Sequence, residues 1–251
     1  RVPALLDSRA ELRRRLESSG VDSVIFLDFT PELMSLTAAG FMDMIHSRYG
    51  VDVLLMGYDN TLGSDRLKDE EAYREAGRVA GVEVVFNGCY RHPATGVTPA
   101  SSLLRKYVGE GRVEDFTLYT GRRYRLEGTV VHGRRNGHKL GFPTINLDVA
   151  EGMCIPSPGV YVGRVIIGPF EHPAVINVGN NPTVTDGSRV SVEGHVPGED
   201  LGELYGAAVA FEFHGRLRGE RRFADIDGLR SAIQADIEEL NRSLDTDVRA
   251  E

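Results

Sequence analysis

Residues 128–147 hold the densest group of side chains in this sequence that could perform chemistry. Gly133, Gly137 and Gly141 interrupt the connection between two expected strands, where glycine lets backbone amides approach an anion closely. Lys139 can add a positive charge to such a loop. The segment is not a Walker loop, because no Gly-Lys-Ser or Gly-Lys-Thr follows and the connection runs from strand to strand. The glycine spacing alone therefore favours an ordinary flexible hairpin.

Two oxygen-bearing side chains follow Pro143 at strand spacing. Thr144 and Asn146 are two residues apart, so on a strand they project from the same face. A hydroxyl and an amide carbonyl are hard, neutral oxygen donors, which suit Mg²⁺ beside nucleotide phosphates. A polar pair that hydrogen-bonds within the mouth of a barrel explains the same two residues when they are taken alone. Their spacing leaves both interpretations open.

The second half of the chain has the pattern of closely spaced strands. Helical periodicity ends near Gly121, and turn residues such as Gly168-Pro169 separate the apolar runs that follow. Six strands are predicted, at residues 125–132, 144–149, 160–167, 174–178, 190–196 and 207–213. Six strands with short turns predict a six-stranded antiparallel β-barrel, which leaves no exposed edge. An apolar stripe in residues 227–244 predicts a C-terminal helix that caps the barrel.

The first half alternates strands with helices, which predicts a parallel sheet with right-handed crossovers. Strands are expected at 21–27, 51–56 and 82–86, and helices at 8–19, from Thr37, at 69–80 and after Thr98-Pro99. Thr98 is the expected N-cap of the last helix. The fold class is therefore α/β followed by all-β, with an incomplete Rossmann-like domain over residues 1–121 and a barrel domain over residues 122–251.

Composition argues against several classes of partner. The chain has 29 Lys and Arg against 37 Asp and Glu, a formal net charge of -8, which disfavours a nucleic-acid backbone as ligand. Cys89 and Cys154 lie far apart without neighbours at ligand spacing, so neither a disulfide framework nor a zinc site is predicted. No apolar run is long enough to span a bilayer. A cytoplasmic protein without membrane or nucleic-acid partners is expected.

Ordered motifs run through residues 124–244. They are Leu-Gly-Phe-Pro-Thr-x-Asn-Leu at 140–147, Pro-Gly-Val-Tyr at 158–161, Asn-Val-Gly at 177–179, Pro-Thr at 182–183, Val-Glu-Gly-His at 192–195, Leu-Tyr-Gly at 204–206 and Arg-Gly-Glu at 218–220. This series resembles the riboflavin kinase domain of bacterial bifunctional riboflavin kinase/FAD synthetases. The resemblance implies a six-stranded barrel with a C-terminal helix, in agreement with the strand pattern.

The resemblance also implies a reaction, transfer of the γ-phosphoryl group of ATP to the 5′-hydroxyl of riboflavin to give FMN. Thr144 and Asn146 would bind Mg²⁺ and the ATP phosphates. The loop from Gly133 to Gly141, together with Pro143, would cover the nucleotide. Glu193 would be the general base that accepts the proton of the attacking hydroxyl.

Three further residues of these motifs are expected to contact riboflavin: Asn177, Arg218 and Glu220. A plain turn explains Asn177 equally well. Arg218 and Glu220 could instead attach the C-terminal helix to the barrel. No catalytic role is assigned to the histidines of these segments, whose separations form no metal-ligand pair: His132, His138 and His195.

The first half resembles, in eroded form, the FMN adenylyltransferase domain that precedes the kinase in this family and makes FAD from FMN and ATP. Residues 57–63, Gly-Tyr-Asp-Asn-Thr-Leu-Gly, match the family's Gly-x-Asp-Phe-x-Phe-Gly in part, and residues 98–105 match its Ser-Ser-Thr-x-Ile-Arg. No His-x-Gly-His phosphate-binding motif occurs in the sequence, so little or no FAD synthesis is expected. The domain is expected to be truncated, as a piece of a longer chain, or degenerate.

Two alternatives to a riboflavin kinase remain. The chain could be a piece of a complete bifunctional enzyme, in which case FAD would accumulate beside FMN. It could instead be a non-catalytic flavin-binding protein, which would bind riboflavin without consuming ATP. Retention of Thr144, Asn146 and Glu193 argues against the second alternative, because a binder has no need of a base and two metal ligands.

Overall fold

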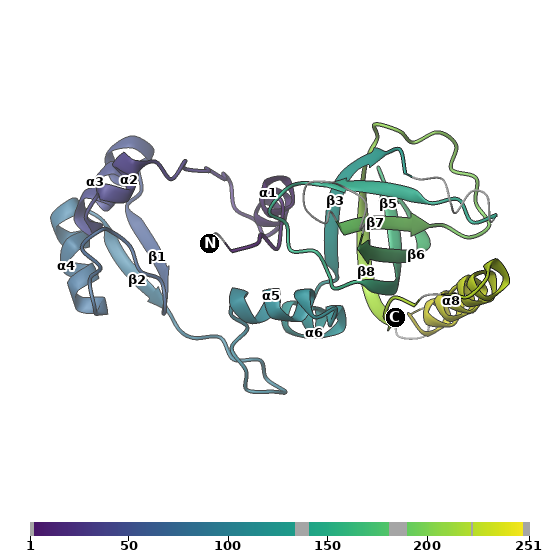
Figure 1. Ribbon diagram of the computed structural model, residues 1–251. Coiled ribbons are helices and arrows are strands. Elements are labelled where there is room, and N and C mark those ends of the chain that lie inside the picture. Colours follow the sequence, from purple (N-terminus) through teal and green to yellow (C-terminus); the bar gives the residue numbers. More distant parts are fainter. Residues whose placement is uncertain (1–2, 134–140, 181–189, 222, 248–251) are drawn as a thin grey trace. The chain divides into compact units, whose positions relative to one another are not determined.

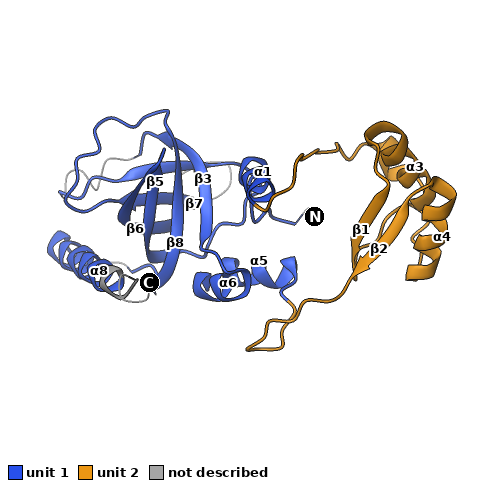
Figure 2. Ribbon diagram, turned by 180° about the vertical axis from the view of Figure 1, so that it is seen from behind, with its two compact units in different colours: residues 1–18, 99–251 blue, residues 19–98 orange. Residues whose placement is uncertain are grey.

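A computed structural model describes residues 3–133, 141–180, 190–221 and 223–247, the last four of these without their side chains. The chain forms two compact units, one of residues 19–98 and one of residues 1–18 with 99–251 (Figure 2). The sequence predicts a boundary between two domains near residue 121, and this boundary stays a prediction. Among the described residues, none of the helices has the length and hydropathy of a membrane span.

The larger unit is built on the closed antiparallel barrel that the sequence predicts (Figure 1). Its strands are β3 (Tyr124–Val131), β4 (Ile145–Val149), β5 (Gly159–Ile167), β6 (Phe170–Asn180), β7 (Val190–His195) and β8 (Ala208–Arg218). They close in the order β3-β4-β7-β6-β5-β8. The order brings β4 and β7 together, although about forty residues separate them in the chain, and the functional residues predicted at 144–146 and 193 lie on or beside these two strands.

Alternating side chains fill the barrel interior. Leu126, Ile176, Phe211 and Phe213 are fully buried there, and the ring of Tyr161 packs edge-on against Phe213 with centroids 5.3 Å apart. Each such side chain stabilises the fold by about 1.5–3 kcal/mol through burial. Because successive side chains of a strand point to opposite faces, the residues between these core positions project from the outer wall of the barrel.

The C-terminal helix α8 (Ile226–Asp247) packs on the outer wall of the barrel. Ile237 and Leu240 bury their side chains against Val160 and Val162 of β5 and Val175 of β6. The apolar stripe predicted for this helix therefore does cover the barrel, along its side. The six-stranded barrel and its C-terminal helix are both confirmed.

Three helices precede or flank the barrel within the same unit: α1 (Arg9–Ser18), α5 (Ser101–Gly109) and α6 (Val113–Thr120). Phe116 of α6 packs edge-on against Tyr124 at 5.1 Å between centroids. The predicted N-cap of α5 is wrong. The helix begins at Ser101, so the N-cap position is Ala100, whose side chain has no hydrogen-bond acceptor. The hydroxyl of Thr98 instead lies 3.2 Å from the thiol sulfur of Cys89.

The smaller unit is an α/β arrangement of α2 (Pro31–Ser35), α3 (Ala38–Tyr49), β1 (Val53–Gly57), α4 (Glu70–Ala80) and β2 (Glu83–Asn87). The two strands are parallel, and Met42, Met56, Tyr73 and Val84 lie in the core between sheet and helices. The sequence predicts a helix that starts from Thr37, and Thr37 caps α3 by accepting a hydrogen bond from the backbone of Gly40.

The strand predicted at 21–27 is wrong. The segment is described without strand structure, and the sheet of this unit consists of β1 and β2 in the part of the chain that the structure describes. Ile25 is 56% exposed. A β-branched run has the propensity for a strand, but a strand forms only where a neighbouring strand accepts its backbone hydrogen bonds. The apolar residues Val53 and Leu55 of β1 are also exposed.

A partly buried carboxylate on β8 is expected to make the stability of the barrel depend on pH. Nε2 of His214 donates a hydrogen bond to Glu212 at 2.8 Å, and this bond, opposed by burial, holds the pKa of Glu212 below its usual value. A depressed folded pKa stabilises the fold above the unfolded pKa, and this stabilisation is lost as pH falls through the folded pKa. From about pH 6 to about pH 3, we expect the free energy of unfolding to fall by about 1 kcal/mol more in wild type than in Glu212→Gln. Urea unfolding measures this difference, and equal losses in both proteins would contradict the assignment.

Candidate active site

Three polar residues form a row across the outer wall of the barrel. Asn146 of β4 pairs in register with Glu193 of β7, and Glu193 pairs in turn with Asn177 of β6. Their chain neighbours Leu147 and Val192 belong to the interior core, so the three polar side chains project outward from the same face. An amide, a carboxylate and a second amide are thereby aligned on adjacent strands.

Thr144 joins this row from the segment that leads into β4. Its hydroxyl donates a hydrogen bond to Oε2 of Glu193 at 3.2 Å, and both side chains are partly buried. A hydroxyl, an amide and a carboxylate thus converge from two strands that are neighbours only in the folded barrel. Thr144, Asn146 and Glu193 are brought together, as the sequence interpretation requires.

Gly133 closes the site on the side of Asn146. A Cβ built on Gly133 would lie 2.2 Å from Nδ2 and 2.4 Å from Oδ1 of Asn146, much closer than atoms can approach. Only glycine leaves the amide of Asn146 in its present position. The first glycine of the predicted loop therefore has a packing reason to be glycine, and Gly141 has a conformational one, because its φ of 85° lies in the left-handed region.

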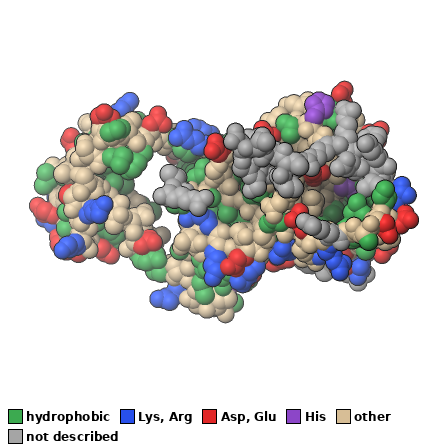
Figure 3. All heavy atoms as spheres, viewed as in Figure 1, with side chains coloured by type: hydrophobic (Ala, Val, Ile, Leu, Met, Phe, Trp, Pro, Cys, Tyr) green, Lys and Arg blue, Asp and Glu red, His purple; other side chains and the backbone are tan. Residues whose placement is uncertain are grey.

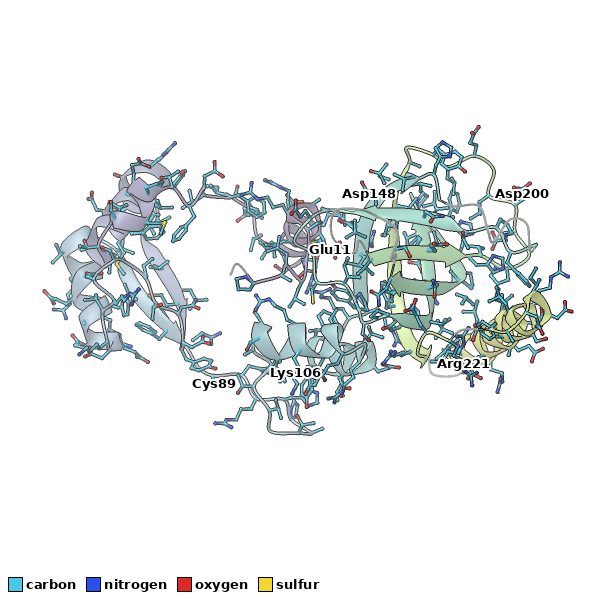
Figure 4. The ribbon with its side chains drawn as sticks, in the orientation of Figure 1. Glu11, Cys89, Lys106, Asp148, Asp200 and Arg221 are labelled. Atoms are coloured by element: carbon cyan, nitrogen blue, oxygen red, sulfur yellow. The ribbon has the colours of Figure 1, made fainter. Side chains whose placement is uncertain are left out.

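A cavity of about 720 Å³ opens beside these residues, a volume typical of sites for small molecules. The end of β3, the start of β4 and the connection between β7 and β8 supply its walls, which include Val131, Gly133, Pro143, Thr144, Asn146, Val196, Glu199, Asp200, Leu201, Leu204 and Tyr205. Figure 4 labels Asp200 on the connection after β7. Glu193 contacts Thr144 but is not one of the described residues that line this cavity.

The cavity walls carry both apolar and charged groups. Leu201 and Leu204 contribute apolar surface, and the ring of Tyr205 lies 3.7 Å from that of His132 between centroids. Glu199 accepts a hydrogen bond from Nδ1 of His172 at 2.7 Å. In the coloured part of the face that Figure 3 shows, acidic and basic side chains are interspersed.

The structure separates the roles proposed for Arg218 and Glu220. The guanidinium of Arg218 donates two hydrogen bonds to the carboxylate of Asp236 on α8, at 2.9 and 2.7 Å. Glu220 accepts a hydrogen bond from the backbone of Asn180 at 3.3 Å and lies beside Gly179. Arg218 therefore attaches α8 to the barrel, while Glu220 lies near the strand end that carries Asn177.

Some predicted residues lie outside the described ranges. Gly137 and Lys139 of the predicted nucleotide loop, His138 and the Pro182-Thr183 motif are among them. In the described residues, no group of three or more His, Cys, Asp or Glu side chains is arranged to hold a metal ion. Thr144 and Asn146 line the cavity with side-chain oxygens that could bind a cation, and the carboxylate of Glu193 lies beside them.

Sequence reasoning missed two parts of the site. The first is the cavity wall formed by residues 196–205, which the spacing of residues in the sequence does not predict. The Leu-Tyr-Gly motif at 204–206 was the one sequence signal in this connection. The sequence motifs assign no catalytic role to His195, yet it is buried and its ring contacts the carbonyl oxygen of Pro143 at 2.8 Å. Only the folded structure reveals that contact.

Both halves of the chain are similar to known proteins. The riboflavin kinase family model matches residues 120–244, and the FAD synthetase model matches residues 1–96. The bifunctional riboflavin kinase/FMN adenylyltransferase of Pseudomonas fluorescens is 32% identical over 94% of this chain and 76% of its own length, and that of Escherichia coli K12 is 30% identical over 94% and 74%. The solved structure of a macrolide-efflux protein from Streptococcus pneumoniae covers 93% of this chain and 74% of its own, with a TM-score of 0.82 and 28% identity.

Proposed function

The chain belongs to the family of bifunctional riboflavin kinase/FMN adenylyltransferases, and we propose that its kinase reaction takes place where Thr144, Asn146 and Glu193 meet. Riboflavin kinase is the activity of its barrel half, an ATP-dependent transferase step of FMN and FAD biosynthesis. The observation that carries the site proposal is the hydrogen bond from Thr144 to Glu193, which holds the carboxylate beside the oxygen donors.

Glu193 is the general base of the proposed reaction. Its carboxylate accepts the proton of the riboflavin 5′-hydroxyl as the hydroxyl oxygen bonds to the γ-phosphorus of ATP. The bond between that phosphorus and the β,γ-bridging oxygen breaks, and ADP leaves with the electron pair. Thr144 and Asn146 hold the phosphate end of the nucleotide, and the 720 Å³ cavity beside them has room for it.

The donor set fits a magnesium ion. The oxygens of Thr144 and Asn146 are hard and neutral, which is the ligand chemistry of Mg²⁺ where substrate phosphates complete the coordination. When bound, Mg²⁺ neutralises charge on the phosphates. A Cβ at residue 133 would overlap the amide of Asn146, so glycine at this position leaves the amide room beside the cavity.

The direct test is FMN formation from riboflavin and MgATP, followed by chromatography. In Thr144→Ala and Asn146→Ala we expect the kcat/KM for MgATP to fall by about tenfold or more and the Mg²⁺ concentration for half-maximal rate to rise, because each variant removes one oxygen donor. Thr129→Ala, an exposed threonine on β3, is the matched control and should match wild type. Normal Mg²⁺ dependence in both site variants would overturn the assignment.

The same assay separates the alternatives. Binding of riboflavin without consumption of ATP would indicate a flavin-binding protein and would contradict the proposed turnover. The match of residues 1–96 to the FAD synthetase family model supports the bifunctional alternative, in which the chain also makes FAD from FMN. FAD appearing after FMN would support that alternative for the 251 residues tested, against the expectation from the sequence.

A further inference from the structure

His195 lies at the end of β7 with its side chain buried to 8% exposure. Its Nδ1 is 2.8 Å from the carbonyl oxygen of Pro143. A carbonyl oxygen only accepts hydrogen bonds, so Nδ1 carries the hydrogen and donates it. The mechanism above makes no use of this buried, hydrogen-bonded ring.

His195 and Glu193 are two residues apart on β7 and project from the same outer face. Glu193 accepts the hydrogen bond of the Thr144 hydroxyl, while His195 donates to the preceding residue, Pro143. The segment that enters β4 is therefore held to β7 at two consecutive residues. Phe142 adds a third contact, because its ring packs edge-on against the His195 ring at 5.5 Å and 89°.

The hydrogen bond to Pro143 acts directly on the direction of Thr144. The carbonyl group of Pro143 and the nitrogen of Thr144 belong to one planar peptide unit. Fixing the carbonyl oxygen fixes that plane, and the plane sets where the Cα of Thr144 lies and how its side chain leaves the backbone. Proline also has a restricted φ, so the segment has few other ways to turn.

We propose that His195 is a positioning residue for phosphoryl transfer, holding Thr144 through the Pro143 carbonyl. The inference rests on the proposed function, in which Thr144 serves the phosphate end of ATP. His195 itself touches neither substrate. Its contribution is the Nδ1 hydrogen bond, which keeps the Thr144 hydroxyl beside Glu193 and at the cavity wall.

Two variants of similar size separate the hydrogen bond from the bulk of the ring. In His195→Asn the amide nitrogen is two bonds from Cβ, as Nδ1 is, so the donor to Pro143 is restored. In His195→Gln the amide nitrogen reaches the region of Nε2 instead. We expect kcat/KM for MgATP within about threefold of wild type in His195→Asn and about 10- to 100-fold lower in His195→Gln, the usual effect of removing a partner that orients a ligand. The KM for riboflavin should stay unchanged in both.

His214→Asn on β8 is the matched control, because it removes another histidine from a barrel strand away from this site, and its kinetics should match wild type. Equal losses in His195→Asn and His195→Gln, or no loss in either, would overturn the positioning role. Unfolding of both variants in thermal melts would overturn it too, since the ring would then serve the barrel itself. Thr144→Ala in the same series distinguishes failure of the proposed kinase site from failure of the positioning role of His195. A normal rate of FMN formation in Thr144→Ala would contradict the site assignment, whatever the histidine variants show.

Discussion

Glu193→Gln should lower the rate of FMN formation by about 10²- to 10⁴-fold, the usual contribution of a general base. The amide keeps the size of the side chain and still accepts the hydrogen bond of the Thr144 hydroxyl, but it cannot take a proton from the riboflavin hydroxyl. The loss is therefore expected in kcat, with a small change in the KM for MgATP. Steady-state kinetics with chromatographic detection of FMN measure both.

Glu171→Gln provides the matched control for Glu193. Glu171 is an exposed carboxylate on β6 whose partner is Arg164, and it lies outside the row of Asn146, Glu193 and Asn177. Its replacement should leave kcat unchanged. If Glu193→Gln keeps a kcat within about threefold of wild type, the general base is another group and the proposed mechanism is wrong.

Asp236→Ala should destabilise the barrel unit by about 3 kcal/mol, because it leaves the Arg218 guanidinium largely buried without its partner carboxylate. The Arg218 side chain is 20% exposed and that of Asp236 8%, so water replaces little of the lost interaction. Thermal or urea unfolding measures the change. The double variant Arg218→Met with Asp236→Leu should recover part of the loss, since it removes both charges and restores apolar packing.

An exposed ion pair on the same helix calibrates this effect. Glu239 contacts Arg242 at 2.7 Å, but their side chains are 44% and 69% exposed. Glu239→Ala should change the free energy of unfolding by less than about 0.5 kcal/mol. If Asp236→Ala has an equally small effect, Arg218 does not fasten α8 to the barrel.

The barrel could be predicted from sequence because each strand carries its own signal. Alternating apolar residues bounded by turn residues placed all six strands, and β5 and β7 begin within one residue of their predicted starts. The segment at 21–27 shows the limit of such signals. Its β-branched residues have strand propensity, but pairing depends on a neighbour that local pattern cannot supply.

In the candidate site, too, local sequence predicts some of the residues, and the others are found only from the pairing of strands. The spacing of Thr144 and Asn146 places them on one face of a strand, and that much is local. Glu193 lies 49 residues from Thr144 in the chain, and only the pairing of β4 with β7 joins them. From sequence alone, that link comes only from the resemblance to the riboflavin kinase family. The contact of His195 could not be predicted, because its partner is a backbone carbonyl, and a pattern of side chains gives no information about such a partner.

Asn146, Glu193 and Asn177 project from the outer wall, whereas Leu126, Ile176 and Phe211 lie in the interior core and do not line the cavity. Volume-conserving exchanges at interior positions that lie away from the cavity walls should therefore change the free energy of unfolding more than the rate of FMN formation. Related barrels can therefore differ in sequence at such core positions and keep the same reaction. Laboratory selection for thermostability can use substitutions at the same positions.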